Sequence, residues 1–372
     1  MAAKEKEQQG QRIKILDQMR GFALLTIFLV NIPGLAGTAV EGQAAINENL
    51  QKFISILLQD SARPLFAFMF GISLILIYDK LREKDMNPYP TLLRRMFILF
   101  MVGVIHGYFI WAGDILMMYA AAGFVLLLFV KWPVRWLLAT ALFFWLGYAV
   151  GMDFLSAYTG YNLEPGDWFI DLFGPFEYLT GLEYMLGEFD SMLDHLGYFL
   201  FGMYAYRVGL FSMAVKRRKP LWVMSFIFLV VGLAGKTGLH YDVDALFLNH
   251  LDNFYPFVVA LGAALGIILA GTSKTVIAHA LVPFDAIGKM TFTHYLMQSL
   301  VFVSLFTLSG STIFDGLGIW TEPSYLFALS IGILFFILQI IVSYLWLQKF
   351  YYGPFEWLWR MGTYARSVTL KK

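Results

Sequence analysis

Residues Ile15–Gly37 read ILDQMRGFALLTIFLVNIPGLAG, an apolar run of the length that crosses a lipid bilayer. The run follows the polar segment MAAKEKEQQGQRIK at 1–14, and it contains Asp17 and Arg20 near its beginning. It is too long for the core of a signal peptide, so we interpret it as a retained first transmembrane helix. The chain is therefore predicted to be a membrane protein.

The composition of the whole chain agrees with this interpretation. Of the 372 residues, 59% are hydrophobic and only 14% are charged, and the mean hydropathy is +0.66. Soluble domains carry about 25% charged residues, so we predict an all-α, polytopic integral membrane protein. The formal net charge of +1 gives no reason to expect a nucleic-acid partner. The chain has no cysteine, which excludes disulfides, thiol catalysis and cysteine-ligated metals.

About ten segments have the apolar composition and roughly the 20-residue length of a transmembrane helix. They lie at 15–36, 62–79, 92–111, 114–131, 133–152, 193–210, 220–237, 254–271, 290–308 and 325–348. Lys and Arg gather at the N-terminus, in every second connection and in the tail, whereas the stretch 153–192 has eight carboxylates and no Lys or Arg. Since positive residues mark the cytoplasmic side, we predict a multi-pass plasma-membrane protein with both termini in the cytoplasm. The acidic loop at 153–192 is then external.

Arg20 is the most informative charged residue of the first segment. A guanidinium inside the hydrocarbon costs about 2.5–3.5 kcal/mol on insertion scales, so an intramembrane arginine indicates a functional site by default. Two interpretations stay open: Arg20 binds a substrate, or it pairs with Asp17 three residues earlier on the same helical face. Arg94 and Arg95 also lie at the predicted inner face, where they either bind an anion or only anchor the topology.

His106 and Asp114 form a second group of candidates. His106 lies five residues before Trp111, so it is about 7.5 Å below the outer end of the third segment. A two-residue turn, Ala112-Gly113, precedes Asp114, and such a tight hairpin can bring the carboxylate back over the last turn of the third helix. A carboxylate in that position can orient an imidazole, as in catalytic pairs. The alternative is that Asp114 only caps a helix and His106 is a satisfied buried histidine.

The remaining candidates are placed by their depth along each helix. Asn31 is sixteen residues into the first segment, or ~24 Å at 1.5 Å per residue, which puts it in the outer half with the histidine–aspartate pair. The candidate substrate-binding residues are Arg20, Arg63, Trp111, Tyr119, His294 and Gln298, of which the last two lie in the inner half to the middle. The outer loop at 240–252 mixes histidine and aspartate without a standard ligand spacing, so no metal site is predicted.

Five blocks of the sequence, in this order, resemble the DUF418, or YeiB-like, membrane protein family over nearly the whole chain. They are LDQMRGFALLTIFLVNI (16–32), RPLFAFMFGIS (63–73), RRMFILFMVGVIHGYFIWAGDILMMYAAAG (94–123), FDAIGKMTFTHYLMQS (284–299) and GPFEWLWRMGTYA (353–365). The apolar runs and the charge pattern divide the chain into a cytoplasmic segment at 1–14 and a region at 15–210 that contains helices one to six and the external loop at 153–192. A DUF418-like region at 211–372 then contains helices seven to ten and an interfacial cytoplasmic tail.

The opening motif LD-x-x-RG groups this family with the transmembrane acyltransferases, which include the acyltransferase-3 enzymes and the lysosomal heparan glucosaminide acetyltransferase. The resemblance implies transfer of an acyl group from cytoplasmic acyl-CoA, a co-substrate, to an acceptor at the outer face. Arg94 and Arg95 are then the candidates for binding CoA. The alternative is a transporter or channel for a small metabolite or lipid without catalysis. The expected partners are membrane lipids and a small-molecule, glycan or lipid acceptor, and a homodimer is left open.

The chain departs from the acyltransferases at one decisive position. Acyltransferase-3 proteins place a histidine eleven residues after the arginine, where this chain has Asn31, and the heparan acetyltransferase uses a histidine in the loop after the first helix. The first histidine of this chain is His106. An amide cannot act as a general base near neutral pH, although it can donate a hydrogen bond to an oxyanion. We therefore expect His106 to transfer the proton, Asp114 to orient it and Asn31 to be the oxyanion donor.

Overall fold

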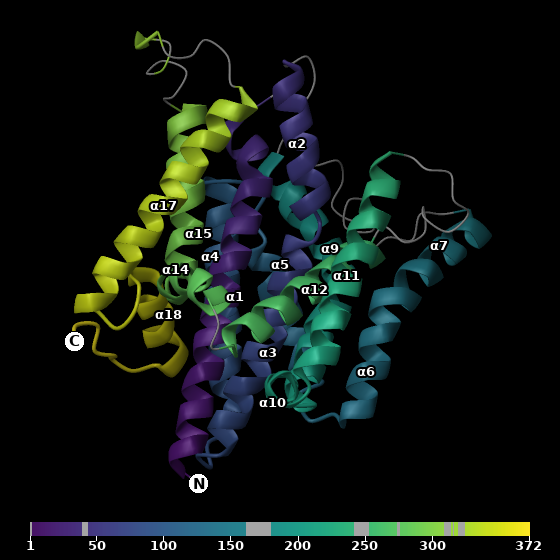
Figure 1. Ribbon diagram of the computed structural model, residues 1–372, viewed down its shortest axis with the longest axis vertical. Helices are drawn as coiled ribbons and strands as arrows, with labels where there is room; N and C mark the ends of the chain where they lie inside the picture. The colour runs from purple at the N-terminus through teal and green to yellow at the C-terminus, as the bar shows by residue number, and fades with distance from the viewer. Residues whose placement is uncertain are drawn as a thin grey trace.

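The computed structural model describes residues 2–38, 44–160, 180–241, 253–273, 276–308, 314, 316–318 and 324–372. Over these ranges the chain is built from helices and has no β-strand, apart from one isolated antiparallel bridge between Phe350 and Lys371. The predicted all-α class is therefore confirmed. Figure 1 shows the helices bundled along the long axis, with the N-terminus and α10 at the lower end and α2 at the upper end.

Each predicted segment contains a helix. The first half of the chain forms α1 (Ala2–Ala36), α2 (Ala45–Leu58), α3 (Ala62–Arg82), α4 (Pro88–Phe109), α5 (Leu116–Leu126), α6 (Val134–Leu142), the π-helical turn η1 (Phe143–Gly147) and α7 (Tyr148–Thr159). The second half forms α9 (Thr180–Arg207), α10 (Leu210–Lys216), α11 (Arg218–His240), α12 (Phe254–Gly271), α13 (Val276–Ala280), α14 (Val282–Lys289), α15 (Thr291–Phe302), η2 (Val303–Leu308), α17 (Tyr325–Lys349) and α18 (Pro354–Tyr364). Long apolar runs thus fold as the helices that a bilayer requires.

Among the described residues, six helical stretches are long and apolar enough to cross a membrane. They are Lys14–Ala36, Ala45–Arg82, Pro88–Phe109, Arg218–His240, Phe254–Gly271 and Tyr325–Lys349. A seventh is present if Met192–Arg207 and Leu210–Lys216, which meet at 57°, form one bent span. The predicted spans at 114–131 and 133–152 contain only the shorter apolar helices Leu116–Leu126 and Val134–Gly147. The number of ten spans and the side on which the termini lie therefore stay predictions.

Glycines allow the closest helix contacts in the bundle. A Cβ atom at Gly71 of α3 would collide with the carbonyl oxygen of Phe199 in α9, and one at Gly202 of α9 would collide with the carbonyl oxygen of Phe68 in α3. The two backbones therefore touch at two successive places. This is the packing expected in a bilayer, where van der Waals contact between backbones replaces the hydrophobic effect as the cause of helix association.

The predicted acidic loop at 153–192 is helical at both ends, because α7 continues to Thr159 and α9 begins at Thr180. Its middle, at 161–179, lies outside the described residues, as do the side chains of 180–191. The mixed histidine and aspartate loop is also outside the described residues from 242 to 252. The proposed roles of both loops stay predictions.

Candidate functional site

His106 and Asp114 form a buried pair between α4 and the start of α5. His106 Nδ1 lies 2.8 Å from Asp114 Oδ1, and each residue is only 1% exposed. Gly103, one turn before the histidine, lets α5 approach, since a Cβ there would collide with the backbone nitrogen of Met117. The contact expected from the tight turn is therefore present, while the catalytic role of the two residues stays a prediction.

This contact determines which nitrogen of His106 is free. A carboxylate oxygen accepts hydrogen bonds, so in the neutral ring Nδ1 carries the hydrogen that faces Asp114, and Nε2 keeps its lone pair. Within the described part of the chain, His106 Nε2 is buried and has no hydrogen-bond partner. Buried polar atoms without a partner are uncommon in proteins and call for an explanation. A lone pair held in this way is what a general base needs before its substrate arrives.

Asp114 has a second function, which is to cap α5. Its Oδ2 accepts hydrogen bonds from the backbone N–H groups of Leu116 at 2.9 Å and Met117 at 3.3 Å. Its Oδ1, the oxygen that faces the histidine, also accepts a bond of 3.3 Å from the hydroxyl of Tyr295. The two interpretations drawn from the sequence are thus compatible, because one carboxylate oxygen caps the helix and the other orients the imidazole.

Tyr295 is the residue of this site that sequence reasoning missed. It lies on α15, is almost fully buried, and its ring centroid is 5.4 Å from that of the His106 imidazole. Its hydroxyl oxygen also accepts a bond of 3.3 Å from the backbone N–H of Ile115. The only available signal was its place directly after His294, and among the chain's 20 tyrosines and 36 phenylalanines this does not stand out.

Arg63 and Tyr119 contact each other, and Arg63 lies near Tyr295. The Tyr119 hydroxyl donates a 2.6 Å hydrogen bond to the backbone carbonyl of Arg63. The half-buried Arg63 side chain is close enough to Tyr295 for its charge to act on that hydroxyl. The first turn of α3 therefore places a cation near the tyrosine that contacts Asp114.

Trp111, which follows α4, packs over α1 near Asn31. The backbone N–H of Trp111 donates to the carbonyl of His106 at 2.9 Å, and the indole covers Gly34, 3.6 Å from the position of a Cβ there. Asn31 lies one turn before Gly34 and is half-buried. Asn31 is thus brought near Trp111, but it takes no part in the described hydrogen bonds of the histidine–aspartate pair.

Arg20 lies nearer the N-terminal end of α1 than Asn31 and contacts two other side chains. Its guanidinium donates to Asp17 Oδ1 at 2.8 Å and to Ser73 Oγ of α3 at 2.7 Å. The pairing with Asp17 is therefore confirmed, and Ser73 is a partner that the sequence did not reveal. About a third of the Arg20 side chain, 33%, is still exposed. Since a guanidinium has five N–H donors, these contacts leave donors for an anion, and binding stays a prediction.

Arg94 and Arg95 connect α4 to the tail helix α18. Arg94 Nε donates to the carbonyl of Thr363 at 3.0 Å, and Cζ of Arg95 lies 3.6 Å from the centroid of the Trp359 ring. The indole Nε1 of Trp359 in turn donates to the carbonyl of Arg95 at 3.1 Å. Arg95 is also close enough to Arg20 for the two charges to repel each other. Arg20, Arg94 and Arg95 therefore concentrate positive charge in this part of the bundle, which favours an anionic ligand.

His294 and Gln298 belong to a separate polar network between α15 and α17. His294 Nε2 lies 2.5 Å from Ser343 Oγ, whose hydroxyl is also 2.7 Å from the carbonyl of Gln339. The amide Nε2 of Gln298 donates to Oε1 of Gln339 at 2.9 Å. These groups form hydrogen bonds with one another, and these bonds join α15 to α17. Their predicted role in substrate binding stays a prediction.

Glu356 joins α18 to the start of α15. Its carboxylate accepts hydrogen bonds from the backbone N–H of Thr293 at 3.0 Å and from the Thr293 hydroxyl at 2.5 Å. Burial nevertheless raises the pKa of the Glu356 carboxyl above its ordinary value. Three successive residues of α15, Thr293 to Tyr295, therefore contact α18, α17 and the beginning of α5.

The chain resembles known proteins over nearly its whole length and matches a family model over its C-terminal part. Residues 205–366 match the family described as "Protein of unknown function (DUF418)". The chain is 28% identical to the uncharacterized protein YxaH of Bacillus subtilis (strain 168), over 98% of this chain and 97% of the relative. It is 25% identical to the uncharacterized protein YeiB of Escherichia coli (strain K12), over 95% of this chain and 96% of the relative. An uncharacterized 39.9 kDa protein from the amylase 3' region of Bacillus acidopullulyticus is also 25% identical, over 97% of each chain. Residues 205–366 therefore match the DUF418 family, and the whole chain is similar to YxaH and YeiB.

Proposed function

We propose that this protein is a membrane-embedded acyltransferase that moves an acyl group from cytoplasmic acyl-CoA to an acceptor at the outer face. The observation that supports this proposal most is the buried Nε2 of His106, which has no partner among the described residues while Asp114 holds the opposite nitrogen. Support also comes from the resemblance of the opening motif, LD-x-x-RG, to that of the transmembrane acyltransferases. The family description names no activity, so the chemistry is argued from the residues.

In the proposed reaction, His106 acts first as a base and then as an acid. Nε2 takes the proton of an acceptor hydroxyl while the acceptor oxygen attacks the carbonyl carbon of the thioester. Asp114 stabilises the imidazolium that forms. The carbon–sulfur bond then breaks, and the imidazolium returns its proton to the departing CoA thiolate. Acyl–sulfur has become acyl–oxygen, and one proton has moved from the acceptor to CoA.

Asn31 and Arg63 have proposed roles around the reacting carbonyl. The Asn31 amide, which lies beside Trp111, is proposed to donate a hydrogen bond to the oxyanion that develops during attack. Arg63 is proposed to bind the acceptor or to stabilise the same negative charge, since its charge acts on Tyr295, which contacts Asp114. Both residues are half-buried, so their side chains can reach a bound molecule without a change of fold.

The inner arginines are proposed to bind the phosphates of CoA. Arg95 and His106 are eleven residues apart on the same helix, so about 16 Å separates their levels. CoA carries its thioester at the end of a long flexible arm, and its phosphates stay at the other end. This distance between the arginines and the proton-transferring histidine suits such a ligand. Arg20, Arg94 and Arg95 would bind the phosphates while the thioester reaches His106.

A carrier is the second candidate, and one observation favours it. The histidine–aspartate pair is almost fully buried, so a substrate reaches it only after the helices move. Such motion is also the basis of alternating access in transporters, where buried ionisable residues mark the substrate or proton path. A carrier would use the same pair to bind a solute or a proton without breaking a thioester.

The deciding experiment measures release of CoA thiol from acyl-CoA by the purified protein supplied with a membrane lipid and glycan extract. His106→Gln should lower turnover by about 10²–10⁴-fold, the usual contribution of a positioned base, and should leave acyl-CoA binding intact. His279→Gln is a matched control because His279 is exposed on α13. If the wild-type protein releases no thiol while His106→Gln still abolishes its function in cells, the enzyme proposal is wrong and the carrier replaces it.

A further inference from the structure

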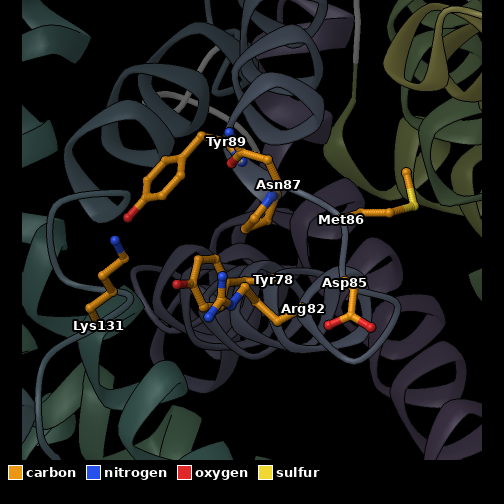
Figure 2. A pocket seen from close by; sticks show the side chains of 8 residues that line it. Tyr78, Arg82, Asp85, Met86, Asn87, Tyr89 and Lys131 are labelled. Atoms are coloured by element: carbon orange, nitrogen blue, oxygen red, sulfur yellow. Dashed lines mark hydrogen bonds between the residues drawn. The ribbon is translucent and has the colours of Figure 1, made fainter.

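A cavity of about 470 Å³ lies at the end of the bundle that the charge pattern assigns to the cytoplasm. It is formed where α3 ends, α4 begins and the turn between α5 and α6 passes by. The polar residues that carry the argument are Tyr78, Arg82, Asn87, Tyr89 and Lys131. Figure 2 shows these side chains grouped around the hollow, with Lys131 on one side and Asp85 at the opposite end.

The aromatic wall of this cavity is rigid. Tyr78 is 6% exposed, and its ring packs edge to face against Tyr89, with centroids 6.0 Å apart and an interplanar angle of 79°. Lys131 Nζ lies 5.2 Å from the centroid of the Tyr89 ring. Such a cation–π contact holds the ammonium group at the mouth without consuming its three N–H donors.

Asn87 supplies a further donor at the first turn of α4. Its Oδ1 accepts a hydrogen bond of 3.2 Å from the backbone N–H of Tyr89, which makes it the N-cap of the helix. The side-chain NH₂ of Asn87 is therefore the group left for a ligand. Two hydroxyl groups, an amide and two cations thus line one concave surface.

The charges of Arg82 and Lys131 are not neutralised by a salt bridge within the described residues. The contrast with Arg207, which lies at the same end of the bundle, is informative. Arg207 donates to Asp79 at 2.8 Å and to the carbonyl of Val130 at 3.2 Å, so its donors are engaged. The cavity itself contains one carboxylate, Asp85, against two cations, which leaves it with a net positive charge.

We infer that this cavity binds the phosphate group of a ligand at the inner face of the membrane. Arg82 offers the planar, bidentate geometry that suits phosphate, Lys131 adds a second charge, and the tyrosine hydroxyls and Asn87 complete the donors. A positive-inside residue that only anchors the topology needs neither a cavity nor neutral donors around it. The site is separate from His106, which lies about 26 Å farther along α4 than Tyr89. The inference therefore does not depend on acyl transfer.

The test compares two double variants of equal charge. Arg82→Gln with Lys131→Gln removes both cations of the cavity, whereas Lys84→Gln with Arg135→Gln removes two cations from the same connections that do not line it. The affinity of each purified protein is measured for inorganic pyrophosphate by titration calorimetry. Binding of phosphatidylglycerol against phosphatidylcholine is measured by native mass spectrometry. Lys131→Arg alone retains the charge and tests whether charge is sufficient.

We expect the cavity double variant to weaken phosphate binding at least ten-fold, while the control double variant and Lys131→Arg stay within about two-fold of the wild type. Loss of pyrophosphate binding identifies a soluble phosphate as the ligand. Selective loss of phosphatidylglycerol identifies a lipid head group, and either result supports the site. Equal weakening by both double variants would show that only the general charge of the inner face matters, and would overturn the inference. So would a wild-type protein that binds neither probe.

Discussion

Asp114→Asn is the change that tests the geometry of the site most directly. Asp114 Oδ1 now faces the Nδ1–H of His106, and Oδ2 faces the N–H groups of Leu116 and Met117. An asparagine has one acceptor oxygen and one NH₂ group, so it cannot face donors on both sides. If its oxygen keeps the cap of α5, its NH₂ points at the histidine. The neutral imidazole must then accept at Nδ1 and carry its hydrogen on Nε2.

The size of the effect follows from these contacts. Loss of one charge-assisted hydrogen bond costs about 1.5–3 kcal/mol of stability. The change of tautomer removes the lone pair from Nε2, and in the serine protease triad the equivalent change lowers kcat about 10⁴-fold. Turnover should therefore fall much more than stability.

The tautomer of His106 can be measured directly by nitrogen NMR of labelled imidazole, and turnover by release of CoA thiol. Glu83→Gln is the control for loss of a carboxylate charge, because Glu83 is exposed at the end of α3 and is not part of the site. A variant in which His106 keeps its hydrogen on Nδ1, or which keeps full turnover, would refute the assigned roles.

Three further predictions concern other parts of the molecule. An engineered Ser191→Cys should react with a membrane-impermeant reagent in intact cells, because the 153–192 stretch lacks Lys and Arg; labelling only after lysis would reverse the topology. Arg20→Lys should weaken acyl-CoA binding, because a lysine cannot reproduce bidentate contacts; a lower melting temperature with unchanged affinity would favour the purely structural role with Asp17 and Ser73. Burial raises the pKa of Glu356, so the folded state holds that proton more tightly than the unfolded state. The wild type should therefore lose thermal stability relative to Glu356→Gln as pH rises from the ordinary carboxyl value through the raised pKa, and parallel melting curves of the two proteins would contradict this.

The parts of the structure that the sequence could predict are those fixed by local constraints. Each predicted span contains a helix, because long apolar runs have no other way to satisfy their backbone in a bilayer. The contact between His106 and Asp114 follows from a turn too short to separate two helix ends. The pairing of Arg20 with Asp17 follows from their spacing of three on one helix.

The parts that could not be predicted are contacts between distant segments. Ser73 lies 53 residues from Arg20, and Tyr295 lies 181 residues from Asp114, and a single sequence contains no information on which distant residues meet. Lys236 is different, because the sequence itself shows an unusual feature, a lysine inside the apolar run at 220–237. It is buried and donates to the carbonyl of Gln59 and, at 3.1 Å, to Ser61 Oγ. It therefore fixes the turn that leads into Arg63.

The contacts of α15 join the region that matches DUF418 to the N-terminal half of this chain. The region that matches the family begins at residue 205, so His106 and Asp114 lie outside it and Tyr295 lies inside it. Tyr295 contacts the carboxylate that orients the histidine, while its neighbours Thr293 and His294 contact α18 and α17. Displacement of α15 would therefore change the contacts of Asp114 and those of the tail helix together. In the proposed enzyme, the C-terminal region is thus not a separate binding module. It supplies Tyr295 to the catalytic site, and its helix α15 also contacts α18, which contacts Arg94 and Arg95.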